Sequence, residues 1–206
     1  DTLWTWSVNH TDLFWECIWQ YFDIQHSGGY QQVLSGNMPS SKWFEGTSLN
    51  YAEHVFSKAT DQHPAIFYKS ENSLPIQISW RALAASVKQL QHHLLQRGVK
   101  PGDRVAAYIT CSPEATVAFL AVNAIGAVWS SCSPDFGAPA VIDRFAQIKP
   151  VVFIATTTYQ YNLKQFDKRT TVSEIADALP SLQEVIVMGD AITHQVPVSM
   201  WNDIME

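Results

Sequence analysis

The chain has 206 residues, enough for one domain with an appendage, and 47% of them are hydrophobic, which can supply a sizeable buried core. The net charge is −6 and no Lys/Arg run is interleaved with aromatic residues, so nucleic acid and anionic membrane surfaces are not expected partners. The apolar stretches are too short for a membrane span, and no secretory leader pattern is present.

The two ends of the chain indicate that it is part of a longer protein, and its cysteines indicate the redox compartment. It begins at Asp1 rather than Met and shows no natural ending, so we expect a piece of a longer protein. Its three cysteines are far apart, which favours a reducing cytoplasm over disulfides or a zinc site. Only 16% of the residues are charged, so apolar surface could be left uncovered and the isolated fragment could self-associate.

The first 47 residues differ from the rest because they hold five of the eight tryptophans. Thr11 or Asp12 can cap a helix that runs to about Phe22 with a broad apolar stripe. Residues 27–41 are rich in Gly, Ser, Asn and Pro and predict irregular chain. We therefore expect an aromatic-rich extension over 1–47 that packs on a main domain over 48–206.

The main domain is predicted to begin with a helix and a strand pair. Asn50 and Glu53 have the spacing of a capping box, so a helix should run to about residue 59. Two short apolar runs predict paired strands at 65–68 and 76–80. Ser79 can cap the next helix, which should end at Gly98. The apolar residues of that helix recur at i, i+4, i+7 and i+11, as Leu83, Val87, Leu90 and Leu94.

From residue 100 onward the pattern alternates between strands and helices. Residues 100–103 (K-P-G-D) suit a type II turn. Strands are predicted at 104–110, 127–132, 151–155 and 184–188. Helices are predicted from Ser112 to Gly126, over 138–148, and after a capping box made by Thr171 and Glu174. This order predicts an α/β fold with a largely parallel sheet flanked by helices.

Several catalytic motifs are missing from the sequence. It has neither the dinucleotide-binding G-x-G-x-x-G nor the phosphate-binding G-x-x-x-x-G-K-[ST], and no G-x-S-x-G. Asp135-Phe136-Gly137 spells D-F-G, but the other kinase motifs are absent. His92 and His93 lack a partner at metal-ligand spacing and are expected on a solvated helix face. No metal site and no catalytic residue is predicted.

Ligands of parallel sheets bind at the carboxyl ends of the strands, which here are 110–112, 130–137 and 156–161. The polar run from Ser130 to Asp135 lies at such an end. It predicts either a ligand site or, with somewhat more weight, a loop whose Ser and Asp cap the next helix. The residues alone indicate an α/β fragment with a strand-end site and do not indicate a reaction.

Three stretches together resemble one family. Residues 43–53 (WFEGTSLNYAE) are similar to W-F-x-G-x-x-L-N-Y-A-E of acetyl-CoA synthetase-like enzymes. Residues 98–105 (GVKPGDRV) resemble G-V-x-x-G-D-R-V of the adenylate-forming superfamily. Residues 129–137 (WSSCSPDFG), followed by 143–145 (DRF), 147–150 (QIKP) and 159–162 (YQYN), resemble the acetoacetate–CoA ligases of that superfamily.

This resemblance implies the first part of the large N-terminal domain of an adenylate-forming enzyme. Such enzymes join a carboxylate, here acetoacetate, to CoA through an acyl-adenylate, with ATP, Mg²⁺ and CoA as cofactors and substrates. The family's phosphate loop, adenine and ribose sites and C-terminal Lys do not occur in residues 1–206. The resemblance therefore implies that this piece alone is inactive and binds none of these molecules tightly.

The resemblance also implies CoA contacts within the chain. The segment aligned with Ser133, Pro134 and Asp135 lines the CoA nucleotide site in acetyl-CoA synthetase-like enzymes. A basic R-x-x-R segment aligned with residues 161–164 contacts it too, which brings in Tyr161, Asn162, Leu163 and Lys164. Tyr161 departs from the pattern by replacing an Arg, and Asp135 adds an acid near a phosphate. Lys164 could supply a cation to the 3′-phosphate or could simply be solvated.

Two other functions stay open at this stage. One is another short-chain acyl-CoA synthetase of the acetyl or propionyl type, because the acyl pocket lies downstream. The other is a non-catalytic module that binds CoA or a protein partner.

Overall fold

The computed structural model describes residues 1–71 and 73–206. These residues form two compact units, Asp1–Lys58 and Ala59–Glu206. The boundary after residue 47 stays a prediction. No helix in the described part of the chain is long and apolar enough to cross a membrane.

The first unit contains three helices and four two-residue strands. Strand β1 pairs with β4 and β2 with β3, both antiparallel, within and beside the segment that was expected to be irregular. The elements are α1 Thr2–Asn9, α2 Thr11–Tyr21, β1 Ser27–Gly28, β2 Leu34–Ser35, β3 Lys42–Trp43, β4 Thr47–Ser48 and α3 Tyr51–Phe56.

Helix α2 confirms the predicted helix, but α1 was not predicted. His10 separates the two helices with non-helical backbone (φ −129°, ψ 59°) and occupies the N-cap of α2, so the caps proposed at Thr11 and Asp12 are wrong. Both of those residues already belong to the helix that His10 opens.

Ring contacts hold the first unit together. Trp19 stacks on Phe44 with 4.2 Å between ring centroids, and Tyr30 meets both rings edge-on at 5.9 and 5.0 Å. Such pairs add about 0.5–1.5 kcal/mol each beyond the area they bury. Since α1 and α2 have no fully buried residue, aromatic contacts replace a continuous core in this unit.

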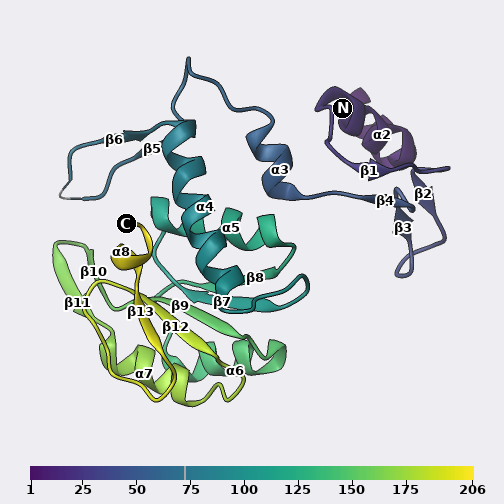
Figure 1. Cartoon of the computed structure of the whole chain (residues 1–206). Helices are drawn as coiled ribbons and strands as arrows, with labels where there is room; N and C mark the ends of the chain where they lie inside the picture. The colour runs from purple at the N-terminus through teal and green to yellow at the C-terminus, as the bar shows by residue number, and fades with distance from the viewer. Residues whose placement is uncertain (72) are drawn as a thin grey trace. The chain divides into compact units, whose positions relative to one another are not determined.

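The second unit is built on a five-stranded, all-parallel sheet in the order β13-β12-β9-β7-β8, with two separate hairpins (Figure 1). The strands are β5 Ile66–Tyr68, β6 Ile76–Ile78, β7 Arg104–Tyr108, β8 Val128–Cys132, β9 Val152–Thr156, β10 Thr158–Tyr161, β11 Lys164–Asp167, β12 Glu184–Met188 and β13 Val198–Met200. The helices are α4 Trp80–Gln96, α5 Pro113–Ile125, α6 Ala138–Ile148, α7 Arg169–Asp177 and α8 Trp201–Ile204.

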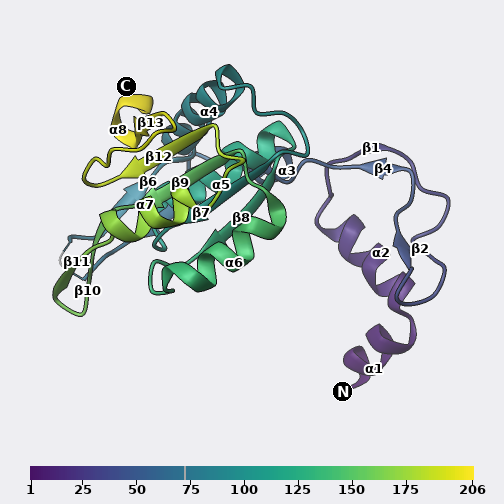
Figure 2. The same ribbon diagram turned by 90° about the horizontal axis from the view of Figure 1, so that it is seen from below.

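Helices α4 and α5 lie on one face of the sheet, and α6 and α7 lie on the other (Figures 1 and 2). Right-handed crossovers explain this arrangement, because the chain moves from β7 to β8 in one direction and then from β8 past β7 to β9 and β12 in the other. The predicted parallel α/β architecture is confirmed. The strand order reverses between β7 and β9, and in such sheets the ligand crevice opens at that point.

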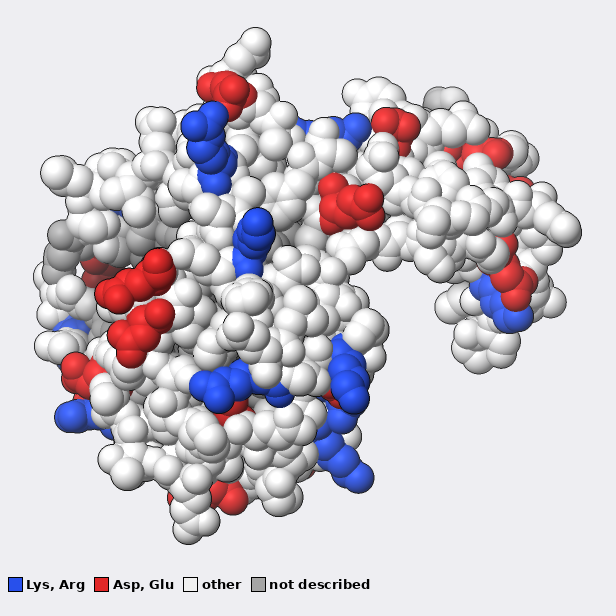
Figure 3. Space-filling view, viewed as in Figure 1, with Lys and Arg blue, Asp and Glu red and all other residues white. Residues whose placement is uncertain are grey.

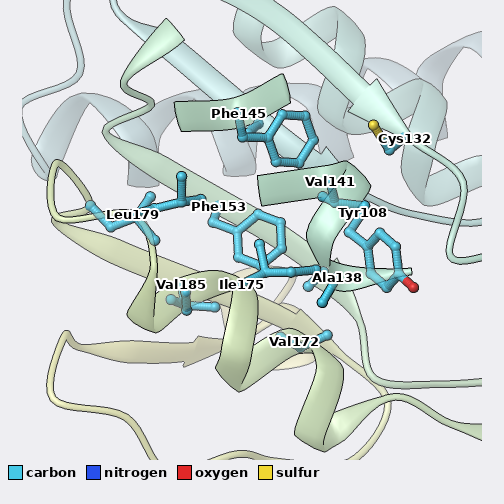
Figure 4. Close-up of a cluster of buried hydrophobic side chains, with 14 of the residues drawn as sticks. Tyr108, Cys132, Ala138, Val141, Phe145, Phe153, Val172, Ile175, Leu179 and Val185 are labelled. Atoms are coloured by element: carbon cyan, nitrogen blue, oxygen red, sulfur yellow. The ribbon is translucent and has the colours of Figure 1, made fainter. Parts of the chain in front are cut away.

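The core under α6 and α7 is apolar and closely packed (Figure 4). Phe145 of α6 meets Phe153 of β9 edge-on, with 6.1 Å between ring centroids. Every residue of β9 is buried, as expected for a central parallel strand covered on both faces. Tyr108 ends β7 within the same cluster, and its hydroxyl points away from the other labelled side chains (Figure 4).

Most local signals acted as predicted. The Ala82 N–H donates to Ser79 Oγ at 3.1 Å and caps α4, and the Glu53 N–H donates to Asn50 Oδ1 at 3.2 Å to open α3. Gly102 has φ +83°, the left-handed position that a type II turn requires.

The capping box predicted at Thr171 and Glu174 is wrong. Helix α7 begins two residues earlier, at Arg169, with Lys168 as its N-cap. The carboxylate of Asp167 accepts the Arg169 N–H at 3.0 Å, so an acid upstream of the helix binds a free N–H of its first turn.

His93 is not on a solvated helix face, so that prediction is wrong for this residue. Its Nε2 lies 2.9 Å from Oε1 of Glu184, which is only 1% exposed at the start of β12. Arg97 Nε lies 3.1 Å from the same oxygen, and the Ser199 hydroxyl donates to it at 2.5 Å. A buried carboxylate needs such partners, and these tie α4 to two strands.

The different burial of two neighbouring leucines of α4 predicts that replacing them with alanine lowers the free energy of unfolding by different amounts. Leu94 is fully buried, whereas Leu95 is 51% exposed. We expect Leu94→Ala to lower the free energy of unfolding by about 2–5 kcal/mol, because it removes buried apolar volume. Leu95→Ala, the matched control, should cost less than about 1 kcal/mol. Equal losses in urea titrations of the two variants would contradict this packing.

Candidate functional site

A cavity of about 710 Å³ opens at the carboxyl ends of the parallel strands, where the order reverses between β7 and β9. Its lining comes from the loops after β7, β8, β9 and β12 and from the β10 side of one hairpin. Residues 68–71, at the end of β5 and after it, and residues 200–202, where β13 meets α8, complete it. The site is therefore where the sequence analysis expected it, but it includes a segment from the first hairpin that was not expected.

A buried tyrosine supports the loop that follows β8. The Tyr108 hydroxyl lies 2.6 Å from the Pro134 carbonyl oxygen and 2.8 Å from that of Phe136, and it donates to them. Burial, aided by the nearby Tyr159 and Asp135, raises the pKa of Tyr108 to about 12. The hydroxyl therefore stays protonated and remains a donor to this loop over the physiological range.

Asp135 is held by hydrogen bonds from two side chains. Ser133 Oγ donates to Oδ2 at 2.8 Å, and the Tyr159 hydroxyl donates to Oδ1 at 3.0 Å. Helix α6 is capped at Gly137 with no side-chain bond, so the interpretation that Ser and Asp of this loop cap the helix is wrong. The acid instead joins the loop after β8 to strand β10.

Tyr159 belongs to the β10–β11 hairpin, which the sequence analysis missed. Its ring stacks on the cross-strand partner Phe166 with 5.2 Å between centroids. The two-residue turn at Asn162 and Leu163 has positive φ at both positions (49° and 61°), which fits the twist of a tight hairpin. Alternating residues flank Asn162, but Leu163 stands where Gly usually marks such a turn, which hid the signal.

The tip of this hairpin is bound by Glu71, a residue that sequence reasoning also missed. Its Oε1 accepts the Asn162 N–H at 2.9 Å, and its Oε2 accepts the Leu163 N–H at 3.0 Å. These two bonds hold the pKa of the Glu71 carboxyl below its ordinary value. Both hairpins of the second unit are thus joined beside the cavity.

The residues predicted to contact CoA are partly brought together. Ser133, Pro134, Asp135 and Tyr161 line the cavity. Asn162, Leu163 and Lys164 lie beyond the cavity lining, at the hairpin tip and on β11. Lys164 pairs with Tyr161 across the hairpin, and cross-strand partners emerge on the same face of a two-stranded sheet.

The cavity combines few charges with many neutral hydrogen-bonding groups. The charged residues of the lining include the cation Lys69 and the acids Glu71, Glu114 and Asp135. Hydroxyls and amides of Thr, Ser, Tyr, Gln and Asn make up much of the remainder. On the face drawn in Figure 3, the described Lys and Arg side chains are interspersed with Asp and Glu. In residues 1–71 and 73–206, no group of three or more His, Cys, Asp and Glu could hold a metal ion.

After β12, Gly189 lets two loops approach each other closely at the cavity wall. Gly189 has φ +98°, and a Cβ there would lie 2.5 Å from Thr158 Oγ1. Thr157 donates its hydroxyl to the carbonyls of Met188 and Asp190 at 3.0 and 2.7 Å. Only glycine fits this approach between the loops after β9 and β12.

Comparison with known proteins identifies the family. Residues 53–200 match the family described as AMP-binding enzyme, and residues 1–55 match the one described as acetyl-coenzyme A synthetase N-terminus. The chain belongs to the AMP-binding enzymes. The predicted resemblance to adenylate-forming enzymes is confirmed.

Similar proteins include several acetoacetyl-CoA synthetases. The one from Rhizobium meliloti (strain 1021) is 36% identical over 180 residues, which are 87% of this chain and 28% of the relative. The one from Macaca fascicularis is 34% identical over 192 residues, covering 91% of this chain and 29% of the relative. The structure of acetoacetyl-CoA synthetase from Streptomyces lividans matches with a TM-score of 0.90 and 40% identity, covering 98% of this chain and 32% of that one. The chain thus spans about a third of the length of these relatives.

The phenol of Tyr159 predicts a pH dependence of stability. Burial, followed by the hydrogen bond to Asp135, raises its pKa to about 12 from the ordinary 10.0. A group whose pKa is raised by folding stabilises the protein at lower pH and loses that contribution as pH rises from 10 through 12. Tyr159→Phe should be less stable than the parent at neutral pH, and the difference should shrink across this window. Urea midpoints measured over the range test this, and a constant difference would contradict it.

Proposed function

We propose that this chain is the N-terminal part of an ATP-dependent acid–thiol ligase that joins acetoacetate to CoA. The observation that carries the proposal is the match of 98% of the chain to the Streptomyces lividans acetoacetyl-CoA synthetase structure at 40% identity. Similarity at 34–36% identity to the Rhizobium meliloti and Macaca fascicularis enzymes supports it.

The proposed reaction has two steps. A carboxylate oxygen of acetoacetate attacks the α-phosphorus of ATP, so that acetoacetyl-adenylate forms and pyrophosphate leaves. The CoA thiolate then attacks the acyl carbon, and AMP leaves with the electron pair of the broken C–O bond. ATP with Mg²⁺ supplies the leaving groups, and the residues that perform both steps lie outside this chain.

This chain's own part in the reaction is to form the CoA side of the site. The cavity fits an uncharged section of CoA, because its lining offers neutral donors and acceptors with the aromatic rings of Tyr68, Tyr159 and Tyr161. Ser133, Pro134 and Asp135 would contact the nucleotide beside these rings. Lys164 would meet a phosphate, because it emerges on the hairpin face that carries Tyr161.

We also propose the organisation and setting of the protein. Residues 1–47 would form an extension of acetyl-CoA synthetase type, and 48–206 the first α/β part of the adenylation domain. The whole protein would act in the cytoplasm on small molecules.

A second candidate differs in the acyl substrate. A malonamoyl-CoA synthetase from Penicillium aethiopicum is 35% identical over 191 residues, 89% of this chain and 26% of the relative. Its similarity is comparable to that of the acetoacetyl-CoA synthetases, so this part of the chain is compatible with more than one acid. Acetate and propionate belong to the same open set.

Pyrophosphate exchange tests the reaction and the acid together. The whole protein should exchange labelled pyrophosphate into ATP with acetoacetate at least about tenfold faster than with acetate, propionate or malonamate, since short acids are distinguished by pocket contacts. Residues 1–206 alone should give no exchange. Faster exchange with another acid would favour the second candidate. Exchange by residues 1–206 alone would contradict the proposal that the catalytic residues lie outside this chain. No exchange with any acid would favour a non-catalytic binding module.

Lys164 tests the CoA placement. Lys164→Ala in the whole protein should raise the KM for CoA by about threefold to tenfold, because it removes a charged contact at an exposed site. Acetoacetate-dependent exchange should be unchanged, since that step precedes CoA attack. Lys88→Ala, on the exposed side of α4, is the matched control and should leave both values unchanged. An unaltered KM for CoA in Lys164→Ala would show that this lysine is merely solvated.

A further inference from the structure

The tip of the β10–β11 hairpin is an anion-binding site that the chain fills with its own carboxylate. Successive N–H groups of Asn162 and Leu163 converge on the two oxygens of Glu71 at 2.9 and 3.0 Å. Consecutive backbone N–H groups in a tight turn form a concavity that favours anions. The bound carboxylate shows that this concavity accepts a negative group.

The backbone of the tip is held in a costly conformation. Leu163 has φ +61° and is 75% exposed, so no packing of its side chain offsets the left-handed conformation. A residue other than glycine persists in this conformation where surrounding contacts fix it. Two sets of contacts fix it here: the pairing of β10 with β11 on both sides of the turn, and the two hydrogen bonds to Glu71.

A positive side chain stands next to the same turn. Lys164 follows Leu163 directly and is exposed, and it leaves the hairpin on the face that carries Tyr161. Tyr161 and Glu71 both line the cavity. Two N–H donors and one ammonium group beside a cavity edge form a set that suits a phosphate monoester, which has three acceptor oxygens and nearly two negative charges.

We propose that Glu71 competes within the molecule for the site that a terminal phosphate monoester of the CoA ligand takes at the hairpin tip. This inference rests on the proposed function, since it takes CoA as the ligand of the cavity. A phosphate displaces Glu71 because it satisfies both N–H groups and also attracts Lys164. A ligand without that phosphate leaves Glu71 in place. Glu71 therefore sets how strongly the enzyme distinguishes CoA from 3′-dephospho-CoA.

The test compares Glu71→Gln with Glu174→Gln in the whole protein. Gln keeps the shape of the side chain and removes its charge, and Glu174 is an exposed acid on α7 outside the cavity lining. We expect Glu71→Gln to lower the KM for CoA by about fivefold, because one charged competitor is lost. The KM for 3′-dephospho-CoA should change by less than about twofold, and Glu174→Gln should change either value by less than about twofold.

Each other outcome overturns the inference in a distinguishable way. If the KM for CoA is unchanged or higher in Glu71→Gln, Glu71 does not compete with the phosphate. If Lys164→Ala still raises the KM for CoA, the proposed position of CoA is nevertheless supported. Equal decreases of the KM for CoA in Glu71→Gln and Glu174→Gln indicate a general effect of the net charge instead of competition at the hairpin tip. Equal gains for CoA and 3′-dephospho-CoA show that the phosphate monoester is not the competing group. If acetoacetate-dependent exchange persists while neither Glu71→Gln nor Lys164→Ala changes the KM for CoA, the CoA placement fails together with this inference.

Discussion

Tyr108 ends the central strand β7, and its ring is buried in the core formed with α6 and α7, while its hydroxyl reaches the carbonyls of Pro134 and Phe136. This contact joins the hydrophobic core to the loop after β8. Pro134 is buried and the Phe136 ring lies 4.9 Å from the Arg144 guanidinium, and the Tyr108 hydroxyl adds a donor that comes from the core. The cavity edge formed by Pro134 and Asp135 is therefore positioned by a residue of the central strand.

The charges around the cavity are organised by contacts within the chain. Asp135 accepts from Ser133 and Tyr159, and Glu71 accepts from two backbone N–H groups of the hairpin tip. Each acid joins two segments that are distant in sequence. Partial neutralisation by these donors explains how a site that carries several acids can lie on the side of the protein that we propose meets CoA.

The second group of polar contacts lies at the amino end of β12. Glu184 gathers His93, Arg97 and Ser199 around one buried carboxylate. Gln89 also donates to the Met205 carbonyl at 3.0 Å, so α4 holds both β12 and the segment that contains α8. Met200 at the end of β13 and Trp201 at the start of α8 line the cavity, so α4, which contacts α8, helps to position this part of the cavity wall.

The parallel α/β fold, the position of most helices and the location of a cavity at the strand ends could all be predicted from the order of the amino acids. These features follow from short-range chemistry: apolar spacing in α4, the Ser79 cap, Gly102 in a type II turn and Gly126 after α5. The family was also predicted from sequence, through the resemblance of W-S-S-C-S-P-D-F-G and its companion stretches, and the match of residues 53–200 to the AMP-binding enzymes confirmed it.

The pairs of polar groups that meet could not be predicted in this way, because they depend on how the elements pack in space. His93 was expected in solvent because it lies on the polar side of its helix. Its partner Glu184 is 91 residues away in sequence, and the two side chains meet only because α4 packs beside the start of β12. The Tyr159–Asp135 bond and the Glu71 contact with the hairpin tip also join segments that are far apart. Such pairs cannot be predicted from local sequence patterns, because the strand order and the packing of helices and hairpins around the sheet determine which side chains become neighbours.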